Sequence, residues 1–167
     1  MLKKPGLRII KTGLAVFVSL FISGLRADGL AFYSAIASVI CMQTNVADTL
    51  HSGINRVIGT LVGGFSGLLY LLFVHNLKLD AWLNYLIISV IATLIIWFLA
   101  SINRKGSISI AAIVLLSVTI NHGKEAAVPF SFAFNRTLDT LIGVMVAIGI
   151  NWLDFEILKK EEKTLNR

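Results

Sequence analysis

The apolar residues of this chain form long runs separated by short polar stretches, and they do not alternate with polar residues. Runs of this kind predict helices. Crossing the hydrocarbon of a bilayer takes about 20 helical residues, and by that measure the second and fifth runs are short. The six predicted spans are Arg8 to Leu25, Gly29 to Gln43, Ile54 to Val74, Ala81 to Ile102, Ser107 to Asn121 and Arg136 to Leu153.

Composition agrees with a membrane location. Of the 167 residues, 56% are apolar and 14% are charged, and the mean hydropathy is +0.83. These values lie outside the usual range of soluble domains. A bilayer can cover this much apolar surface provided that every backbone polar group is bonded within a helix or a closed barrel. The sequence therefore predicts an all-α integral membrane protein whose first partner is the lipid bilayer.

A short motif occurs twice and divides the chain into halves. NRVIGTLVG, starting at Asn55, returns 80 positions later as NRTLDTLIG, starting at Asn135. This offset aligns the first three spans with the last three, giving repeat one at about 8–75 and repeat two at about 86–153. Halves with an odd number of spans enter the membrane from opposite sides, so the predicted fold is two inverted three-helix repeats. Chance similarity between apolar helices is the alternative.

Charge in the loops predicts the orientation. With six spans, eleven Lys and Arg residues lie on the side of both termini and four on the other side. Because cytoplasmic loops hold the excess of positive charge, both termini are expected in the cytoplasm of a multi-pass cell membrane protein. The net charge of +6 then reflects topology and does not indicate nucleic acid as a partner. One membrane domain covers 1–153, followed by a short charged tail at 154–167.

The repeated motif places one arginine in each half, Arg56 and Arg136. Each is predicted to lie in the first turn of its helix, where free backbone amides and the helix dipole favour anions. A guanidinium group matches a carboxylate, so the pair is a candidate site for an organic anion. The alternative is that both side chains extend to the membrane interface and only set the depth of their helices.

Other polar residues of the spans complete the candidate site. Charged and polar groups are costly at membrane depth and tend to face a cavity or a partner. The residues at the short second and fifth spans could contact a substrate or cap helix ends, and both interpretations stay open. The additional substrate-binding candidates are Asn55, Asn135, Thr60, Thr140, Gln43, Asn121 and His122.

Asp139 occupies the position in the second motif that Gly59 holds in the first. Since it follows Arg136 by one helical turn, a structural ion pair with that residue is the favoured interpretation. Proton coupling is the alternative role for this carboxylate.

Small residues recur at four-residue spacing in the third span and continue in the sixth. Gly59, Gly63 and Gly67 form the first stripe, and Gly143 belongs to the second. Such stripes let helices approach closely, so helix packing is the favoured interpretation and a lining of a permeation path is the alternative. His51 and His75 are predicted to lie in loops.

The sequence has no metal-ligand cluster, no phosphate-binding loop and no acidic pair at helical spacing in a span. We therefore expect no metal, no cofactor and no enzymatic activity.

The stretch MQTNVADTLHSGINRVIGTLVGG, Met42 to Gly64, resembles the aromatic acid exporter family, also called the fusaric acid resistance protein-like family. The opening RIIKTGLAVFVSLFIS, Arg8 to Ser23, is similar too. The resemblance covers about Gly6 to Leu153 and implies export of aromatic carboxylic acids or related organic anions. The residues that carry it are Gln43, Asp48, Ser52, Gly53, Asn55, Arg56, Gly59 and Thr60.

Many members of that family also have a sizeable cytoplasmic domain, and larger relatives have a second membrane module. The chain lacks both, so a homodimer is expected to restore the missing surface. Two alternative functions remain open: a passive anion channel on the same scaffold, and a non-transporting membrane subunit that docks a separate cytoplasmic partner through the tail.

Overall fold

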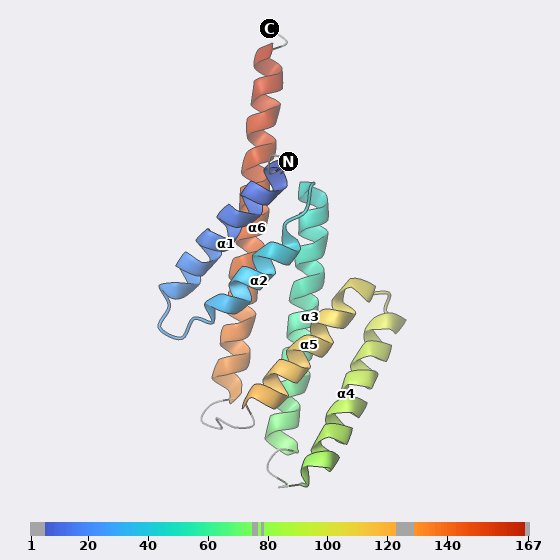
Figure 1. Ribbon diagram of the computed structural model, residues 1–167. Helices are drawn as coiled ribbons and strands as arrows, with labels where there is room; N and C mark the ends of the chain where they lie inside the picture. The colour runs from blue at the N-terminus through green and yellow to red at the C-terminus, as the bar shows by residue number, and fades with distance from the viewer. Residues whose placement is uncertain (1–5, 75–76, 78, 123–128, 166–167) are drawn as a thin grey trace, which may run out of the picture. The chain divides into compact units, whose positions relative to one another are not determined.

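The computed structural model describes residues 6–74, 77, 79–122 and 129–165, with side chains except at 121–122, 129 and 154–165. Helices account for nearly all of this part of the chain, and it contains no strand. The all-α class is therefore confirmed. The six helices of Figure 1 are α1 (Leu7–Gly24), α2 (Ala31–Cys41), α3 (Val46–Phe73), α4 (Ala81–Ser101), α5 (Lys105–His122) and α6 (Pro129–Leu165).

Four helices are long and apolar enough to cross a membrane. The qualifying segments are Leu7–Gly24, Val46–Phe73, Ala81–Ser101 and Phe130–Leu153. By contrast, α2 has 11 residues and is therefore only about 16 Å long at 1.5 Å per residue. The structure supports a multi-pass membrane protein, while six full crossings stay a prediction.

Two helices begin earlier than the sequence predicted. Helix α3 begins at Val46, eight residues before the expected start, and α6 begins at Pro129, seven residues before it. Hydropathy marks where apolar residues begin, whereas a helix can start with polar residues that face water. Proline is favoured at the first helical position, which explains the start of α6. His51 consequently lies in α3 and not in a loop, and His75 lies outside the described residues.

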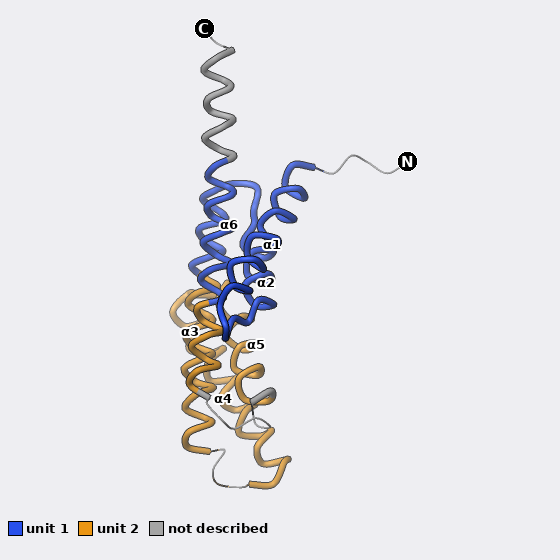
Figure 2. The backbone as a smooth tube through the Cα atoms, turned by 90° about the vertical axis from the view of Figure 1, so that its left-hand side faces the viewer, with its two compact units in different colours: residues 1–54, 139–167 blue, residues 55–138 orange. Residues whose placement is uncertain are grey.

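The helices form two compact units, shown in different colours in Figure 2. Unit 1 comprises residues 1–54 and 139–167, and unit 2 comprises residues 55–138. Each unit therefore contains the first two helices of one sequence repeat together with segments of both α3 and α6. The units do not coincide with the predicted repeats.

In unit 1, α1 runs antiparallel to α2 and α6. The Ser34 hydroxyl of α2 donates to the Ser19 carbonyl of α1 over 3.1 Å, and further bonds join α1 to α6 near both ends. Buried residues of α1 and α2 in this contact are small, including alanines and serines. At Gly143 of α6, an added Cβ would overlap the Ser34 carbonyl oxygen and lie 2.7 Å from the Ala37 Cβ. The α6 backbone thus lies directly against α2.

In unit 2, α3 packs against α5 in the same way. A Cβ added at Gly59 would lie 2.7 Å from the Ser107 carbonyl oxygen, and one at Gly67 would lie 2.8 Å from the Val118 Cβ. Gly63, between them, lies so close that a Cβ would overlap the Ala111 carbonyl oxygen. Because the contacts advance in the same direction along both helices, α3 and α5 are parallel.

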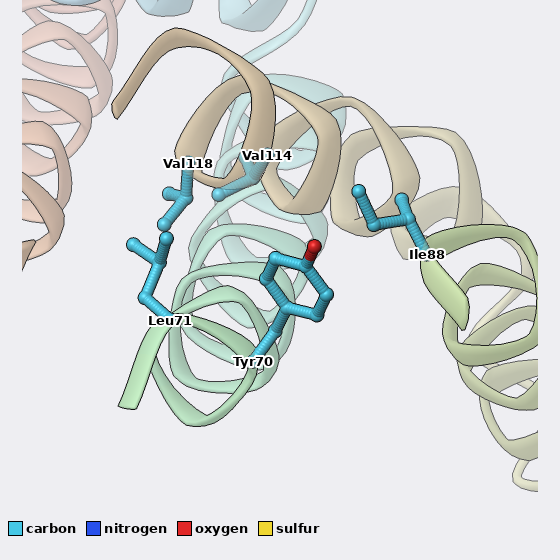
Figure 3. Packing of buried hydrophobic residues seen from close by; sticks show 5 residues of the cluster. All are labelled: Tyr70, Leu71, Ile88, Val114 and Val118. Atoms are coloured by element: carbon cyan, nitrogen blue, oxygen red, sulfur yellow. The ribbon is translucent and has the colours of Figure 1, made fainter. Parts of the chain in front are cut away.

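An apolar cluster completes unit 2. Figure 3 shows residues of α3, α4 and α5 that meet beside the glycine contacts. The Tyr70 ring belongs to this cluster, and its hydroxyl lies 3.0 Å from the Asn84 side-chain oxygen of α4. The phenol is thereby paired at the edge of an otherwise apolar core. The buried members are Tyr70, Leu71, Ile88, Val114 and Val118.

The closest glycine contact is present once in each unit. Gly63 lies on Ala111 and Val114 in unit 2, and Gly143 lies on Ser34 and Ala37 in unit 1. The two glycines are 80 positions apart. Their partners are 77 positions apart, both for Ser34 with Ala111 and for Ala37 with Val114. The third helix of each sequence repeat therefore packs on the second helix of the other repeat.

Gly63→Ala is expected to destabilise the protein because its new methyl group must displace the α5 backbone. Overpacking of this kind costs about 1–3 kcal/mol. Gly64→Ala is the matched control, since the nearest atom to its Cβ would be a Val114 methyl at 3.9 Å. Thermal unfolding in detergent should show a lower Tm for Gly63→Ala only. Equal Tm values would contradict the packing described for α3.

Candidate functional site

Both motif arginines lie well inside their helices. Arg56 is ten residues beyond the start of α3, and Arg136 is seven residues beyond the start of α6. These separations correspond to about 15 Å and 10 Å along the helix axes. The prediction that each arginine sits in a first helical turn is therefore wrong, and free amides of the helix start do not contribute to a site there.

The two arginines are also buried within the protein. Arg56 is 9% exposed and Arg136 is 5% exposed, both in unit 2. The Arg136 Nη1 donates to the Ser117 hydroxyl of α5 over 2.9 Å. Side chains that extended to the membrane interface would be exposed. This burial favours an internal role for both guanidinium groups.

The arginines lie at different heights in unit 2. A groove between α3 and α6 is lined by Leu61 and Leu68 of α3 and by Thr137 and Phe130 of α6. The two helices run in opposite directions (Figure 1), so Leu61 lies at the same end of the groove as Thr137, and Leu68 at the same end as Phe130. Arg136 then lies at the level of a residue on α3 that is six positions from Arg56. At 1.5 Å per residue, the backbone positions of the two arginines are about 9 Å apart along the helix axes.

Two other motif residues accompany Arg56. Asn55 is 8% exposed, and its side-chain oxygen lies 3.5 Å from the Ser107 hydroxyl of α5. A Cβ added at Gly106 would lie 2.6 Å from the Asn55 Nδ2, so the amide contacts the α5 backbone directly. Thr60 is buried one turn farther along α3. The first motif thus supplies a buried polar segment facing α5.

The second motif is divided between the units. Asn135 is half-buried in unit 2, and its Nδ2 donates to the Ser131 hydroxyl over 3.3 Å. Thr140 is buried in unit 1. The candidates Asn121 and His122 are the last residues of α5, and their side chains lie outside the described part of the structure.

Asp139 lies at the centre of a buried cluster in unit 1, the Asp139 cluster. Its side chain is 0% exposed and receives hydrogen bonds from three donors. The Arg26 Nη1 is 2.8 Å from Oδ1, the Leu30 amide is 2.7 Å from Oδ2, and the Ser23 hydroxyl donates to Oδ1. All three groups donate to the carboxylate, which accepts through both of its oxygens.

The Asp139 cluster joins three segments. Ser23 belongs to α1, Arg26 to the following loop, and Leu30 is the residue before α2, whose own side chain supplies no cap. The carboxylate therefore occupies the positive end of α2, where a negative charge is favoured. The sequence suggested Arg136 as the ion-pair partner, and the structure gives Asp139 an ion pair with Arg26.

A second polar group in unit 1, the Asn151 network, forms where α2 ends and α3 begins. Asn151 of α6 is 2% exposed. Its Nδ2 donates to the Thr49 hydroxyl over 2.8 Å and to the Gln43 carbonyl over 3.1 Å. The Lys11 Nζ donates to the Asn151 Oδ1 over 3.3 Å. The Arg8 Nη2 donates to the Gln43 Oε1 over 3.4 Å.

Gln43 therefore binds other protein groups through both its main chain and its side chain. In addition to the bonds above, its main-chain N–H donates to the Thr49 hydroxyl over 3.1 Å, and its side-chain Nε2 donates to the Ile40 carbonyl over 3.1 Å. The latter bond is a local cap of the end of α2. Gln43 thus has a structural role in addition to its candidacy as a substrate contact.

Sequence reasoning missed Arg26, Lys11, Thr49 and Asn151. Two signals were available. Arg26 lies on the side of the predicted topology that is poor in positive charge, as Arg136 does. Asn151 interrupts the apolar run of the last span, and a polar side chain at such depth needs a partner.

Two open apolar grooves lie in unit 2 and are distinct from the arginines. The larger, of about 630 Å³, lies between α3 and α4 and is lined by residues such as Phe65, Tyr70 and Phe98. The smaller, of about 300 Å³, lies between α3 and α6. Ligand sites combine apolar walls with convergent polar groups, and neither lining includes Arg56 or Arg136. The buried arginines are therefore the stronger candidates.

Among the described residues, no group of three or more His, Cys, Asp or Glu side chains could hold a metal ion. The single cysteine, Cys41, is buried in unit 1 at the end of α2. The described polar clusters instead consist of guanidinium, ammonium, carboxylate, amide and hydroxyl groups.

Comparison with known proteins identifies one relationship. The family model described as "Fusaric acid resistance protein-like" matches residues 14–150. This match includes both motif arginines, both stripes of glycine and all of α2 to α5. No curated protein and no solved structure matches the chain significantly.

Arg26→Gln is expected to destabilise unit 1 because it leaves the buried Asp139 carboxylate without its cation. Breaking a buried ion pair costs 3–5 kcal/mol, and the 28% exposure of the Arg26 side chain reduces this to about 1–3 kcal/mol. Adding Asp139→Asn should recover part of the loss, since the site is then neutral. Unfolding in detergent micelles would measure the double-mutant cycle.

Asp28→Asn provides the control for this cycle, because Asp28 is an exposed carboxylate of the same loop. It should leave the free energy of unfolding unchanged. If the effects of Arg26→Gln and Asp139→Asn simply add, the two side chains do not form the energetic pair described here.

Proposed function

Since the chain belongs to the fusaric acid resistance protein-like family, a family of membrane transport proteins, we propose that it exports aromatic carboxylic acids or related organic anions across a cell membrane. The observation that carries this proposal is the burial of Arg56 and Arg136 deep within unit 2. Charged groups at membrane depth cost at least ~2.5 kcal/mol each and mark substrate pathways.

In this proposal the guanidinium groups bind the carboxylate of the transported anion. A guanidinium fork presents paired N–H donors that match the two oxygens of a carboxylate. Asn55 and Thr60 lie on the same helix as Arg56. They supply an amide and a hydroxyl that donate to the carboxylate lone pairs that the guanidinium does not contact. Asn135 is the corresponding candidate beside Arg136 in unit 2, and Thr140 is the further candidate of the second motif, in unit 1.

The separation of about 9 Å along the helices makes the two arginines successive sites. In this proposal each guanidinium binds the carboxylate in turn. Transport requires binding that is favourable enough for entry and weak enough for release. Two moderate sites at different heights meet this requirement better than one strong site.

The proposal includes the predicted topology and assembly. All six helices cross or enter the membrane as two inverted repeats, both termini are cytoplasmic, and two copies form a homodimer. The duplicated glycine contact supports the repeat, and the excess of Lys and Arg on one side supports the orientation. Energy comes from a proton gradient or from the gradient of the anion itself. The three donors around Asp139 favour a structural ion pair over proton coupling.

Arg136→Gln and Arg56→Gln should each lower efflux of a labelled hydroxybenzoate from loaded proteoliposomes by at least about tenfold. Each removes a charge-assisted hydrogen bond of about 1.5–3 kcal/mol to the carboxylate. Arg136→Lys should keep part of the flux because it keeps the charge but not the fork. Unchanged flux in correctly inserted Arg136→Gln protein would eliminate its role.

Arg104→Gln is the control for these variants. Arg104 is an exposed residue between α4 and α5, so its loss changes the net charge by the same amount without altering the buried site. Flux should stay within about twofold of the wild type.

Electrical recording separates the exporter from its alternatives. A secondary exporter gives no unitary currents, whereas a passive anion channel gives discrete conductance steps in a planar bilayer. A non-transporting subunit moves no anion in liposomes and copurifies with one stoichiometric cytoplasmic partner. Either result would replace the exporter proposal.

A further inference from the structure

Helix α5 is held against α3 on both sides of Ser117. A Cβ added at Gly63 would lie 2.9 Å from the Val114 Cβ. One added at Gly67 would lie 2.8 Å from the Val118 Cβ. Both valines are buried in the apolar cluster of unit 2, where Figure 3 shows them on α5 beside α3. Helices packed this closely have little room to slide or turn, so the turn of α5 that contains Ser117 has a set position relative to α3.

The Ser117 hydroxyl extends from this turn to α6. It accepts a hydrogen bond from the Arg136 Nη1 over 2.9 Å. Ser117 follows Val114 by three residues and therefore lies about 60° around the helix from it, beside the face that packs on α3. Arg136 is 5% exposed, so little water competes for this hydrogen bond. The bond joins the second motif arginine to a helix that the glycine contacts of α3 hold in place.

The contact is made at the tip of a long side chain. Arginine has several rotatable bonds, and ordering them costs more side-chain entropy than in most residues. The five N–H groups of a guanidinium lie in one rigid fork. A bond at Nη1 therefore restricts the direction in which the other donors of Arg136 point.

We propose that Ser117 is a positioning residue, which orients the Arg136 guanidinium toward the carboxylate of the transported anion. This inference rests on the proposed function. A group that is already ordered loses less entropy when its ligand binds, so pre-orientation raises affinity without any contact between Ser117 and the anion. A serine that only satisfied a buried guanidinium would stabilise the fold and leave the affinity for the anion unchanged.

Efflux of labelled hydroxybenzoate from proteoliposomes, measured over a range of internal concentrations and normalised to inserted protein, tests the proposal. Ser117→Ala should raise the half-saturating concentration about fivefold, the effect of one ordinary hydrogen bond, and keep the maximal rate within about twofold. Ser117→Thr retains a hydroxyl acceptor and should stay within about twofold of the wild type in both quantities. A lower maximal rate at an unchanged half-saturating concentration would assign Ser117 to stability alone and overturn the proposal.

Thr119→Val is the matched control on the same helix. Thr119 is 5% exposed, and its hydroxyl donates to the Leu115 carbonyl of α5 over 2.9 Å. The variant thus removes a second buried hydroxyl of α5, one that bonds within its own helix, and valine keeps the shape of the side chain. Both efflux quantities should stay within about twofold of the wild type. An equal rise of the half-saturating concentration in Thr119→Val and Ser117→Ala would contradict a specific role for Ser117.

The double variant Ser117→Ala with Arg136→Gln separates this inference from the proposed function. If Ser117 acts through Arg136, adding Ser117→Ala to Arg136→Gln should change efflux by less than about twofold. Losses that multiply would show that Ser117 acts by another route, and the positioning role would be wrong. If Arg136→Gln lowers efflux while Ser117→Ala changes neither quantity, only the positioning role fails. If Arg136→Gln has no effect, the proposed function fails, and Ser117 has no binding group to position.

Ser117→Cys covers the case in which the alanine variant does not insert into the membrane. A thiol is close in size to a hydroxyl and is a weaker acceptor, so the half-saturating concentration should rise about threefold. An unchanged half-saturating concentration in correctly inserted Ser117→Cys protein would also overturn the proposal.

Discussion

The close approach of helix backbones at glycine underlies both units. Gly143 brings α6 against the α2 backbone, and Gly63 brings α3 against α5. Without a hydrophobic driving force between helices in lipid, association depends on close packing and on hydrogen bonds between helices. The glycine contacts supply the close packing, and they bring polar groups near enough to form the hydrogen bonds. In unit 1, the Asp139 cluster and the Asn151 network lie on either side of Gly143 along α6.

The two units use the same contact differently. Gly59 and Asp139 occupy the same position of the repeated motif, 80 residues apart. The residues that they contact, Ser107 and Leu30, are 77 residues apart, which is the same offset as between the glycine partners on α5 and α2. In unit 2 a glycine lets the Ser107 carbonyl approach, whereas in unit 1 a carboxylate accepts the Leu30 amide. The first arrangement needs only space. The second adds a buried charge, which requires the cation supplied by Arg26.

Much of the fold could be predicted from the sequence, because hydropathy and repetition are local signals. The long runs locate six helices, and the duplicated motif locates the equivalent glycines. Helix starts could not be predicted in the same way. Helix α3 begins at Val46 with a partly polar first turn, so its apolar run starts later. Helix α6 begins at Pro129 with largely apolar residues, which the predicted start at Arg136 left out. Because both helices begin earlier than predicted, Arg56 and Arg136 lie in helix interiors and not at helix ends.

The partners of polar groups were less predictable, because they depend on which helices are neighbours. Local spacing suggested Arg136 for Asp139, yet the ion pair is made with Arg26, more than 100 residues away in sequence. Arg26 thereby has a carboxylate within the protein, which would have to be displaced before a substrate could take its place. Arg136 donates to the Ser117 hydroxyl, a neutral group. The partner of a buried charge therefore follows from which helices pack together, and the spacing of residues within one helix does not reveal it.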